Sequence, residues 1–188
     1  DYPELFKELG GRNAELMVVT PSFVDLLLID KSFNKYLMPN LKKILFCGEK
    51  LGESTVSKLF ERFENLEIIN YYGPTECTFA VTCDKVKKGE KISIGIPKKD
   101  VKIFIVDDNL QELKENEVGE ILISGESVGS GYLKKELNKD VFIEFKGEKS
   151  YLTGDLGYKS NDKFYCLGRK DKQVQYKGYR VEISEIES

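Results

Sequence analysis

The chain contains no histidine, and its four cysteines show no Cys-x-x-Cys spacing. Histidine is the usual general base and a usual zinc ligand, so its absence argues against Ser-His, Cys-His and zinc chemistry. The formal net charge is −3 and basic residues are scattered among acidic ones, so no basic face is available for a phosphate backbone and we exclude nucleic-acid binding. No apolar run approaches the roughly 20 residues that span a bilayer, so we expect no membrane insertion and a cytoplasmic location.

The composition is that of an ordered, soluble domain. Hydrophobic residues make up 40% and charged residues 32% of the 188 positions, which is typical of globular proteins. The chain begins at Asp1 rather than at a methionine, and it ends in "VEISEIES", where a capped helix is expected to begin. We therefore expect it to be a piece of a larger protein.

Two patterns divide the chain. Residues 1–83 alternate predicted helices with short apolar strands, including "LKKILFCGEKL" and "LEIINYYG", which is typical of a parallel α/β sheet. Residues 84–168 alternate polar and apolar positions between turns, which predicts an antiparallel β region, most simply a small barrel or sandwich. In residues 169–188 we expect a hairpin that turns at Lys177-Gly178, followed by the start of a helix.

The stretch "NYYGPTE" lies at the carboxyl end of the last of the predicted parallel strands. Ligands of open parallel sheets bind beyond the carboxyl ends of the strands. There Tyr71 or Tyr72 could stack on a heterocycle, Gly73 would let the backbone approach closely, and Thr75 offers a hydroxyl to a phosphate oxygen. Glu76 offers the hard oxygen that magnesium prefers. The alternative is a loop with core aromatics and a solvated glutamate.

Three further residues are candidates for binding. Cys47 follows a buried strand, where a small thiol could shape a pocket, although most such cysteines are inert core residues. Asp155 follows a glycine in what we predict to be a tight turn, where a carboxylate could accept both ribose hydroxyls or only bond its own turn. Arg169 ends a strand and could bind phosphate or ribose, or be a surface charge. We interpret the glycine-rich "GESVGSGYL" as a β-turn region, because it lacks the Lys-Ser/Thr of a P-loop.

Four motifs in order, "YYGPTE", "GEILISGESVGSGYL", "YLTGDLG" and "GRKDKQVQYKGYRVEISEIE", resemble the consecutive signatures of the acyl-adenylate-forming superfamily. Within it, "TPSFVDLLL", "LFCGE" and "NYYGPTECTFAVT" are most similar to the D-alanine:carrier-protein ligases. The resemblance implies part of a large amino-terminal domain, with a partial parallel sheet and a distorted antiparallel β-barrel. It also implies ATP- and magnesium-dependent activation of D-alanine, or of another small amino acid. The product would pass to the phosphopantetheine thiol of a carrier protein, for teichoic acid D-alanylation.

The resemblance assigns the nucleotide-binding residues. Asn70 and Tyr72 would bind adenine, and Asp155 would bind the ribose hydroxyls with help from Arg169. Asp171 matches the hinge about which a carboxyl-terminal subdomain rotates between adenylation and thiolation.

The remaining roles concern the reacting groups. Thr75 would contact the α-phosphate, and Glu76 would hold magnesium, which makes these two the catalytic residues. The backbone at Gly73 would meet the amino acid, and Cys47 would help to distinguish D-alanine from L-alanine. Phe79 departs from the valine usual in these ligases, which leaves the pocket size and the amino acid open.

Parts of the family's site lie outside this sequence. The resemblance places the phosphate loop and an ammonium-binding aspartate before Asp1, and the catalytic lysine after Ser188. We therefore expect the 188-residue chain alone not to turn over. Gln175 also departs from a lysine common in relatives. Two other functions stay open: an adenylation domain of a nonribosomal peptide synthetase for another amino acid, and a non-catalytic nucleotide-binding fragment.

Overall fold

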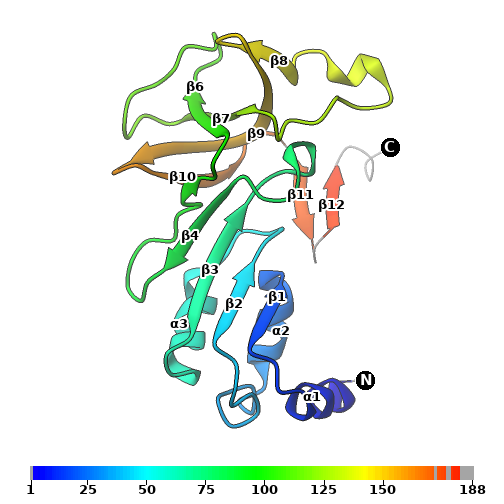
Figure 1. The fold of residues 1–188 in the computed structure, drawn as a ribbon, viewed down its shortest axis with the longest axis vertical. Helices are drawn as coiled ribbons and strands as arrows, with labels where there is room; N and C mark the ends of the chain where they lie inside the picture. Colours follow the sequence, from blue (N-terminus) through cyan, green and yellow to red (C-terminus); the bar gives the residue numbers. More distant parts are fainter. Residues whose placement is uncertain (1, 172, 177–178, 183–188) are drawn as a thin grey trace. The chain divides into compact units, whose positions relative to one another are not determined.

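The computed structural model describes residues 2–171, 173–176 and 179–182, the last two ranges as backbone only (Figure 1). The chain divides into two compact units, which we describe separately. The first comprises Asp1–Asn70 and Lys85–Ile92, and the second comprises Tyr71–Asp84 and Ser93–Ser188. The division of the sequence into 1–83, 84–168 and 169–188 rests on motif boundaries rather than on compactness, and it stays a prediction.

The first unit alternates helices and strands, as its sequence predicts. Strand β1 pairs in parallel with β2, and β2 pairs in parallel with β3, so the predicted parallel sheet is confirmed. In order, the elements are α1 (Tyr2–Gly11), β1 (Leu16–Val19), α2 (Pro21–Ile29), β2 (Lys43–Phe46), α3 (Glu53–Arg62) and β3 (Glu67–Tyr72).

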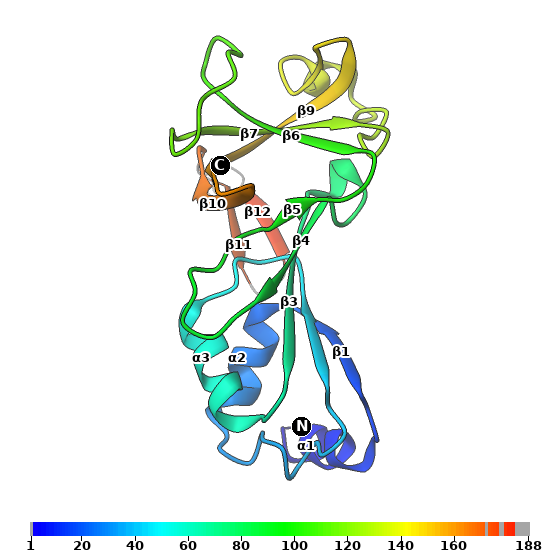
Figure 2. The same cartoon turned by 60° about the vertical axis from the view of Figure 1, so that its left-hand side comes forward.

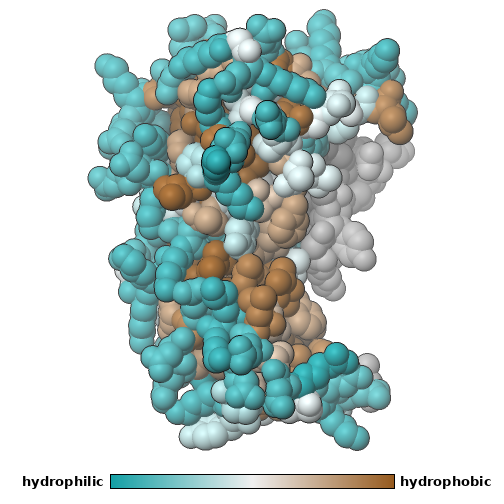
Figure 3. Space-filling view, viewed as in Figure 1, coloured by the Kyte–Doolittle hydropathy of each residue, from teal (hydrophilic) through white to brown (hydrophobic). Residues whose placement is uncertain are grey.

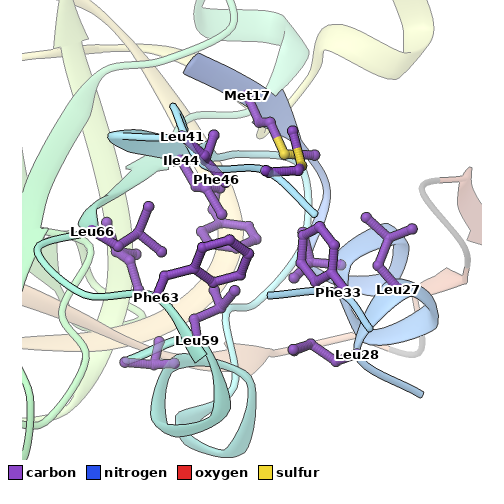
Figure 4. Packing of buried hydrophobic residues seen from close by; sticks show 14 of the residues in the cluster. Met17, Leu27, Leu28, Phe33, Leu41, Ile44, Phe46, Leu59, Phe63 and Leu66 are labelled. Atoms are coloured by element: carbon purple, nitrogen blue, oxygen red, sulfur yellow. The ribbon is translucent and has the colours of Figure 1, made fainter. Parts of the chain in front are cut away.

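The core of the first unit lies between the three parallel strands and the helices α2 and α3, which cover the same face of these strands (Figures 1 and 2). Ile44 and Phe46 alternate with half-buried residues along β2 and are 0% exposed, which is the period of two that a strand imposes. Figure 4 shows Phe46, Phe33 and Phe63 meeting in this core, where the last two rings pack edge to face at 5.2 Å. On β1, Leu16 and Val18 are exposed, and Figure 3 shows apolar residues gathered over β1 and β2.

The second unit is mostly β, also as predicted. Its main sheet has the order β10-β9-β7-β6, with β8 paired to β9, and every pairing in it is antiparallel. This sheet curls into a half-barrel around a core that includes Ile121, Ile123 and Tyr151 (Figure 2). Its elements are η1 (Thr75–Cys77), β4 (Thr82–Val86, which ends in the first unit), β5 (Ile96–Pro97), β6 (Val101–Val106), β7 (Gly119–Gly125), η2 (Lys135–Asn138), β8 (Phe142–Phe145), β9 (Glu148–Ser160) and β10 (Lys163–Arg169).

The last described strands, β11 (Gln173–Tyr176) and β12 (Tyr179–Glu182), form the predicted antiparallel hairpin. The predicted turn at Lys177-Gly178, the helix start after Glu182 and the Gln175 side chain lie outside the described residues. Within the described part of the chain, no helix combines the length and the apolar composition that crossing a membrane requires.

Candidate functional site

The second unit contains a cleft of about 920 Å³. It is lined by η1, by the middle of β9, by the end of β10 and by the segments that follow β6 and β7. Four residues singled out from the sequence lie on its wall: Thr75, Glu76, Arg169 and Asp171. With Tyr132 and Gly154 also on the wall, the cleft brings together residues from all four ordered motifs.

Asp155 lies inside a strand, so the predicted tight turn is wrong. Strand β9 runs without interruption through this position. Its pairing with β7 shifts there, because Glu120 faces Leu156 whereas Leu122 faces Leu152. Residues 153–155 of β9 therefore stand opposite a single residue of β7, which makes a β-bulge.

Side-chain hydrogen bonds hold this bulge. The Gly154 N–H donates to Oε1 of Glu120 at 2.9 Å, and the buried Thr153 hydroxyl donates to the Ile121 carbonyl at 2.8 Å. Gly154 has a φ of +72°, and a Cβ there would lie 2.5 Å from Nη2 of Arg169, so a side chain would be strained and would displace the guanidinium. At the bulge, these side-chain hydrogen bonds between β9 and β7 take the place of regular backbone hydrogen bonds.

Tyr72 and Arg169 both contact the Asp155 carboxylate. The Tyr72 hydroxyl donates to Oδ2 at 2.6 Å, and Nη1 of Arg169 lies 3.4 Å from Oδ1. Burial, followed by the charge of Asp155, raises the pKa of Tyr72 well above its usual value, so the phenol stays a neutral donor. A carboxylate oxygen has two lone pairs, so accepting one hydrogen bond from the protein does not by itself prevent it from accepting a ligand hydroxyl.

Arg169 links the bulge to the segment after β10. Its Nη1 donates to the Thr153 carbonyl at 2.5 Å, while Nε and Nη2 donate to the two Asp171 oxygens at 2.9 and 2.5 Å. Burial opposes the guanidinium charge, but the hydrogen bonds to Asp171 and the charge of Asp155 outweigh it and raise the pKa of Arg169. The predicted hinge residue Asp171 thus accepts two hydrogen bonds from the guanidinium of Arg169, on the wall of the cleft.

Lys170 and Glu120 extend this group, and sequence reasoning missed both. The Lys170 N–H donates to the Gly154 carbonyl at 2.7 Å. Its ammonium donates to Asp108 at 2.5 Å and to Glu120 at 3.3 Å. The sequence carries no signal of these contacts, because Asp108 lies in the turn after β6 and Glu120 on β7, both far from Lys170 along the chain.

Glu76 lies on the short helix η1, which begins directly after the extended residue Pro74. The Tyr132 hydroxyl donates to its Oε1 at 2.5 Å, and the Gly129 N–H donates to its backbone carbonyl at 2.7 Å. Both partners belong to the glycine-rich stretch that we interpreted only as a β-turn region. Tyr132, the last residue but one of this stretch, was the available sequence signal for a binding residue.

The loop between β3 and β4 is strained. A Cβ on Gly73 would lie 2.8 Å from backbone atoms of Phe79, Ala80 and Val81, so the chain's own close approach already requires this glycine. Thr78 and Phe79 have φ values of +61° and +57°, which are uncommon outside glycine. The Ala80 N–H bonds the Thr78 carbonyl at 2.7 Å and closes a three-residue turn. Such strain concentrates at functional sites.

Two of the predicted residues belong to the first unit. Cys47 is 8% exposed, and its N–H donates to the Val19 carbonyl at 3.3 Å just after β2. Asn70 is 5% exposed in β3. Glu49, from the same "LFCGE" motif, binds the start of α2: the Ser22 N–H and hydroxyl donate to its two oxygens at 2.8 and 3.0 Å.

The oxygen-bearing side chains of the cleft suit a metal cation that is bound together with a nucleotide's phosphates. Among the described residues, no group of three or more cysteine, aspartate or glutamate side chains could hold a metal ion alone. Glu76 and the adjacent Thr75 hydroxyl supply hard oxygens on the cleft wall. Magnesium is usually bound by one or two carboxylates together with phosphate oxygens and water, so this donor set suits a magnesium nucleotide.

Known proteins match this chain closely. The model of the AMP-binding enzyme family matches residues 1–133. A D-alanine--D-alanyl carrier protein ligase from Listeria innocua is 42% identical over 98% of this chain. One from Bacillus licheniformis is 40% identical over 97%. The chain spans 38% of the length of each of these relatives.

Solved structures agree with the sequence comparison. A Vibrio cholerae adenylation domain in complex with glycyl-adenosine-5'-phosphate is 29% identical, with a TM-score of 0.86 over 97% of this chain and 36% of its own. A nonribosomal peptide synthetase protein with adenylation and carrier domains is 26% identical, with a TM-score of 0.86 over the whole of this chain and 34% of its own. The fold, the ordered motifs and the extent of the family match together show that the chain belongs to the AMP-binding enzyme family.

Proposed function

We propose that the protein containing this chain activates D-alanine with ATP as an aminoacyl adenylate and transfers it to the phosphopantetheine thiol of a carrier protein. The name shared by the relatives from Listeria and Bacillus supports this substrate and this partner. The carrying observation is that Asp155, with Tyr72 and Arg169 on its oxygens, lies in the same unit as Glu76, and that its neighbour Gly154 and its partner Arg169 line the cleft together with Glu76. ATP use fits the cytoplasmic location that we expect.

The nucleotide would bind through the bulge of β9. Asp155 would accept the two ribose hydroxyls, held in place by Tyr72 and Arg169. The Tyr72 ring and Asn70 would contact adenine. The two residues are two positions apart at the end of β3, and residues with this spacing lie on the same face of a strand. A carboxylate that is already oriented loses little freedom when the ribose arrives, which favours binding.

The reaction would take place next to η1. Thr75 would contact the α-phosphate, and Glu76 would hold magnesium, which neutralises phosphate charge when bound. The substrate carboxylate would attack the α-phosphorus and release pyrophosphate. This chemistry requires positioning and charge neutralisation rather than a protein nucleophile, in keeping with a chain without histidine.

The amino acid would be selected by Cys47, by the backbone at Gly73 and by Phe79. Phe79 is 62% exposed in the strained loop, so its ring is available to a ligand. Asp171 would act as the hinge. Under this proposal, residues 1–83 belong to the sheet portion of the AMP-binding domain, 84–168 to its barrel and 169–188 to the hinge and first hairpin of a carboxyl-terminal subdomain.

A second candidate is an adenylation domain for a different amino acid. The structural neighbours favour it, since one holds a glycyl adenylate and another belongs to a nonribosomal peptide synthetase. Phe79 in place of valine would change the size of the pocket. A nucleotide-binding protein without turnover is the remaining alternative.

The decisive experiment is ATP-dependent pyrophosphate exchange by the full-length protein with D-alanine, L-alanine and a panel of other amino acids. We expect a preference for D-alanine that weakens in Cys47→Ala and persists in Cys83→Ala. Preference for another amino acid would move the assignment to the second candidate. Absence of exchange with every amino acid would leave nucleotide binding without turnover.

Nucleotide binding itself is tested with Asp155→Asn. We expect ATP affinity to fall by about 10- to 100-fold, because hydrogen bonds to a charged group are lost. Asp162→Asn is the matched control, since its carboxylate is 92% exposed in the turn between β9 and β10. Equal affinities of the two variants in calorimetric titration would contradict the assignment of the ribose site.

A further inference from the structure

The glycine-rich segment after β7 holds Glu76 at two points. The Tyr132 hydroxyl donates to Oε1 of Glu76 at 2.5 Å across 56 positions of sequence. The Gly129 N–H donates to the Glu76 carbonyl at 2.7 Å, and a Cβ on Gly129 would lie 2.9 Å from that oxygen. Both the backbone and the carboxylate of Glu76 are therefore oriented by one segment.

Tyr132 is itself held on its backbone. Asn138 accepts the Tyr132 N–H at 2.6 Å through Oδ1 and donates to the Tyr132 carbonyl at 3.2 Å through Nδ2. Gly131 has a φ of +109°, and a Cβ there would come within 3.0 Å of the Asn138 amide. The segment before Tyr132 can follow this path only with glycine.

The ring and the hydroxyl of Tyr132 are also fixed. Phe142 packs edge-on against the ring, with the centroids 5.3 Å apart. The hydroxyl lies 3.3 Å from that of Tyr151, which is 1% exposed. The position of the phenolic oxygen is thus set by the backbone, the ring and a buried neighbour, rather than by the bond to Glu76 alone.

We propose that Tyr132 is a positioning residue for Glu76: its hydroxyl occupies Oε1 and turns Oε2 toward the divalent cation that accompanies the nucleotide. This inference rests on the proposed function, in which Glu76 holds that cation. A free glutamate side chain loses rotamer freedom when it binds a metal, and a carboxylate that is already oriented loses less. Hydrogen-bond partners of metal ligands commonly change metal affinity by 10- to 100-fold.

The test measures the metal directly. Full-length protein is saturated with an ATP analogue that carries an α,β-methylene bridge, and Mn²⁺ binding is followed by electron paramagnetic resonance. We expect Tyr132→Phe to bind Mn²⁺ about 10- to 100-fold more weakly. Its melting temperature and its affinity for the metal-free analogue should not change, because the ring against Phe142 is retained. Tyr165→Phe, which removes a hydroxyl from a ring stacked on Tyr158, is the matched control.

A double-mutant cycle with Glu76→Gln separates positioning from general stabilisation. If Tyr132 acts through Glu76, Tyr132→Phe should have no further effect on Mn²⁺ affinity in the Glu76→Gln background. An equal loss in both backgrounds, or no loss in the native one, would overturn the inference. If Tyr132→Phe does not fold, Asn138→Ala replaces it in the same cycle.

The two proposals fail in different ways. If Glu76→Gln leaves Mn²⁺ affinity unchanged, Glu76 is no metal ligand, and both the proposed metal role and the role of Tyr132 are overturned. If Glu76→Gln weakens Mn²⁺ binding and Tyr132→Phe does not, the proposed function stands and only the inference about Tyr132 falls.

Discussion

The two units of this protein use their polar side chains differently. In the first, they satisfy the ends of helices: Glu49 accepts from Ser22 at the start of α2, and Arg62 donates to the carbonyls of Leu28 and Asp30 at its end. In the second, polar side chains converge on the cleft. The same kinds of hydrogen bond therefore complete secondary structure in one unit and prepare a binding site in the other.

This difference has an energetic consequence. Removing a group that completes a helix end or a core should lower the free energy of unfolding and leave the cleft as it was. Removing a group that orients Asp155 or Glu76 should act chiefly on ligand affinity. Four substitutions test this contrast: two measure stability in the first unit, and one in each unit measures its dependence on pH.

The largest effect is expected in the core of the first unit. Phe46 is 0% exposed between β2 and the helices, so Phe46→Ala removes buried surface and leaves a cavity. We expect the free energy of unfolding to fall by about 3–5 kcal/mol. Ile29→Ala, at a residue 77% exposed on α2, is the control and should cost less than about 0.5 kcal/mol. Urea unfolding of both variants measures this, and similar midpoints would contradict the assigned core.

A smaller loss is expected at the end of α2. Nη1 of Arg62 donates to the Asp30 carbonyl at 2.6 Å, and Nη2 donates to the Leu28 carbonyl at 2.8 Å. Arg62→Met keeps much of the side-chain volume but leaves these carbonyls without their donor, so we expect a cost of about 2–3 kcal/mol. Lys58→Met, on the exposed side of the same helix α3, is the matched control. Equal stability of the two variants would show that the guanidinium only covers the surface.

The smallest expected effect is a difference between the two units in how stability depends on pH. In the first unit, hydrogen bonds from Lys43 and Lys85 lower the pKa of Glu67 from 4.5 to about 2. The unfolded state then takes up a proton first, so this contribution to stability is present above pH 4.5 and is lost as the pH falls toward 2. The melting temperature of Glu67→Gln should therefore fall less than that of the native protein as the pH is lowered through this range.

The second unit should respond to alkali instead. Burial, and then the charge of Asp155, raises the pKa of Tyr72 above its usual 10.0, so its contribution is present below pH 10.0 and is lost as the pH rises further. Tyr72→Phe should therefore lose less stability above that pH than the native protein. Melting curves across both pH ranges measure the two slopes, and a parallel response of the variant and the native protein in either range would contradict the assigned group.

Much of the fold could be predicted from the sequence, because periodicity and turn residues act over short distances. The alternation of helices and strands predicted for residues 1–83, the strand within "LEIINYYG" and the carboxyl-terminal hairpin are all confirmed. Glycine and polar residues at these turns, and apolar residues at helical or strand spacing, determine such elements locally.

The local pattern misled at Asp155. A glycine followed by an aspartate is typical of a turn, and here it forms a bulge inside a long strand. The bulge depends on two hydrogen bonds between β9 and β7. Glu120 of β7 accepts one from the Gly154 N–H, and Thr153 of β9 donates the other to the Ile121 carbonyl. Pairing between distant strands therefore overrode the local preference.

The sequence by itself determined which elements form, the order of the motifs and the kinds of side chain available for a nucleotide. Only the tertiary structure decided that Tyr72 meets Asp155 across 83 positions and that Tyr132 meets Glu76 across 56. Hydrogen bonds of this kind act over about 3 Å, whereas sequence patterns report on neighbours along the chain. Their partners are known only once the sheet has closed and its registers and bulges are set.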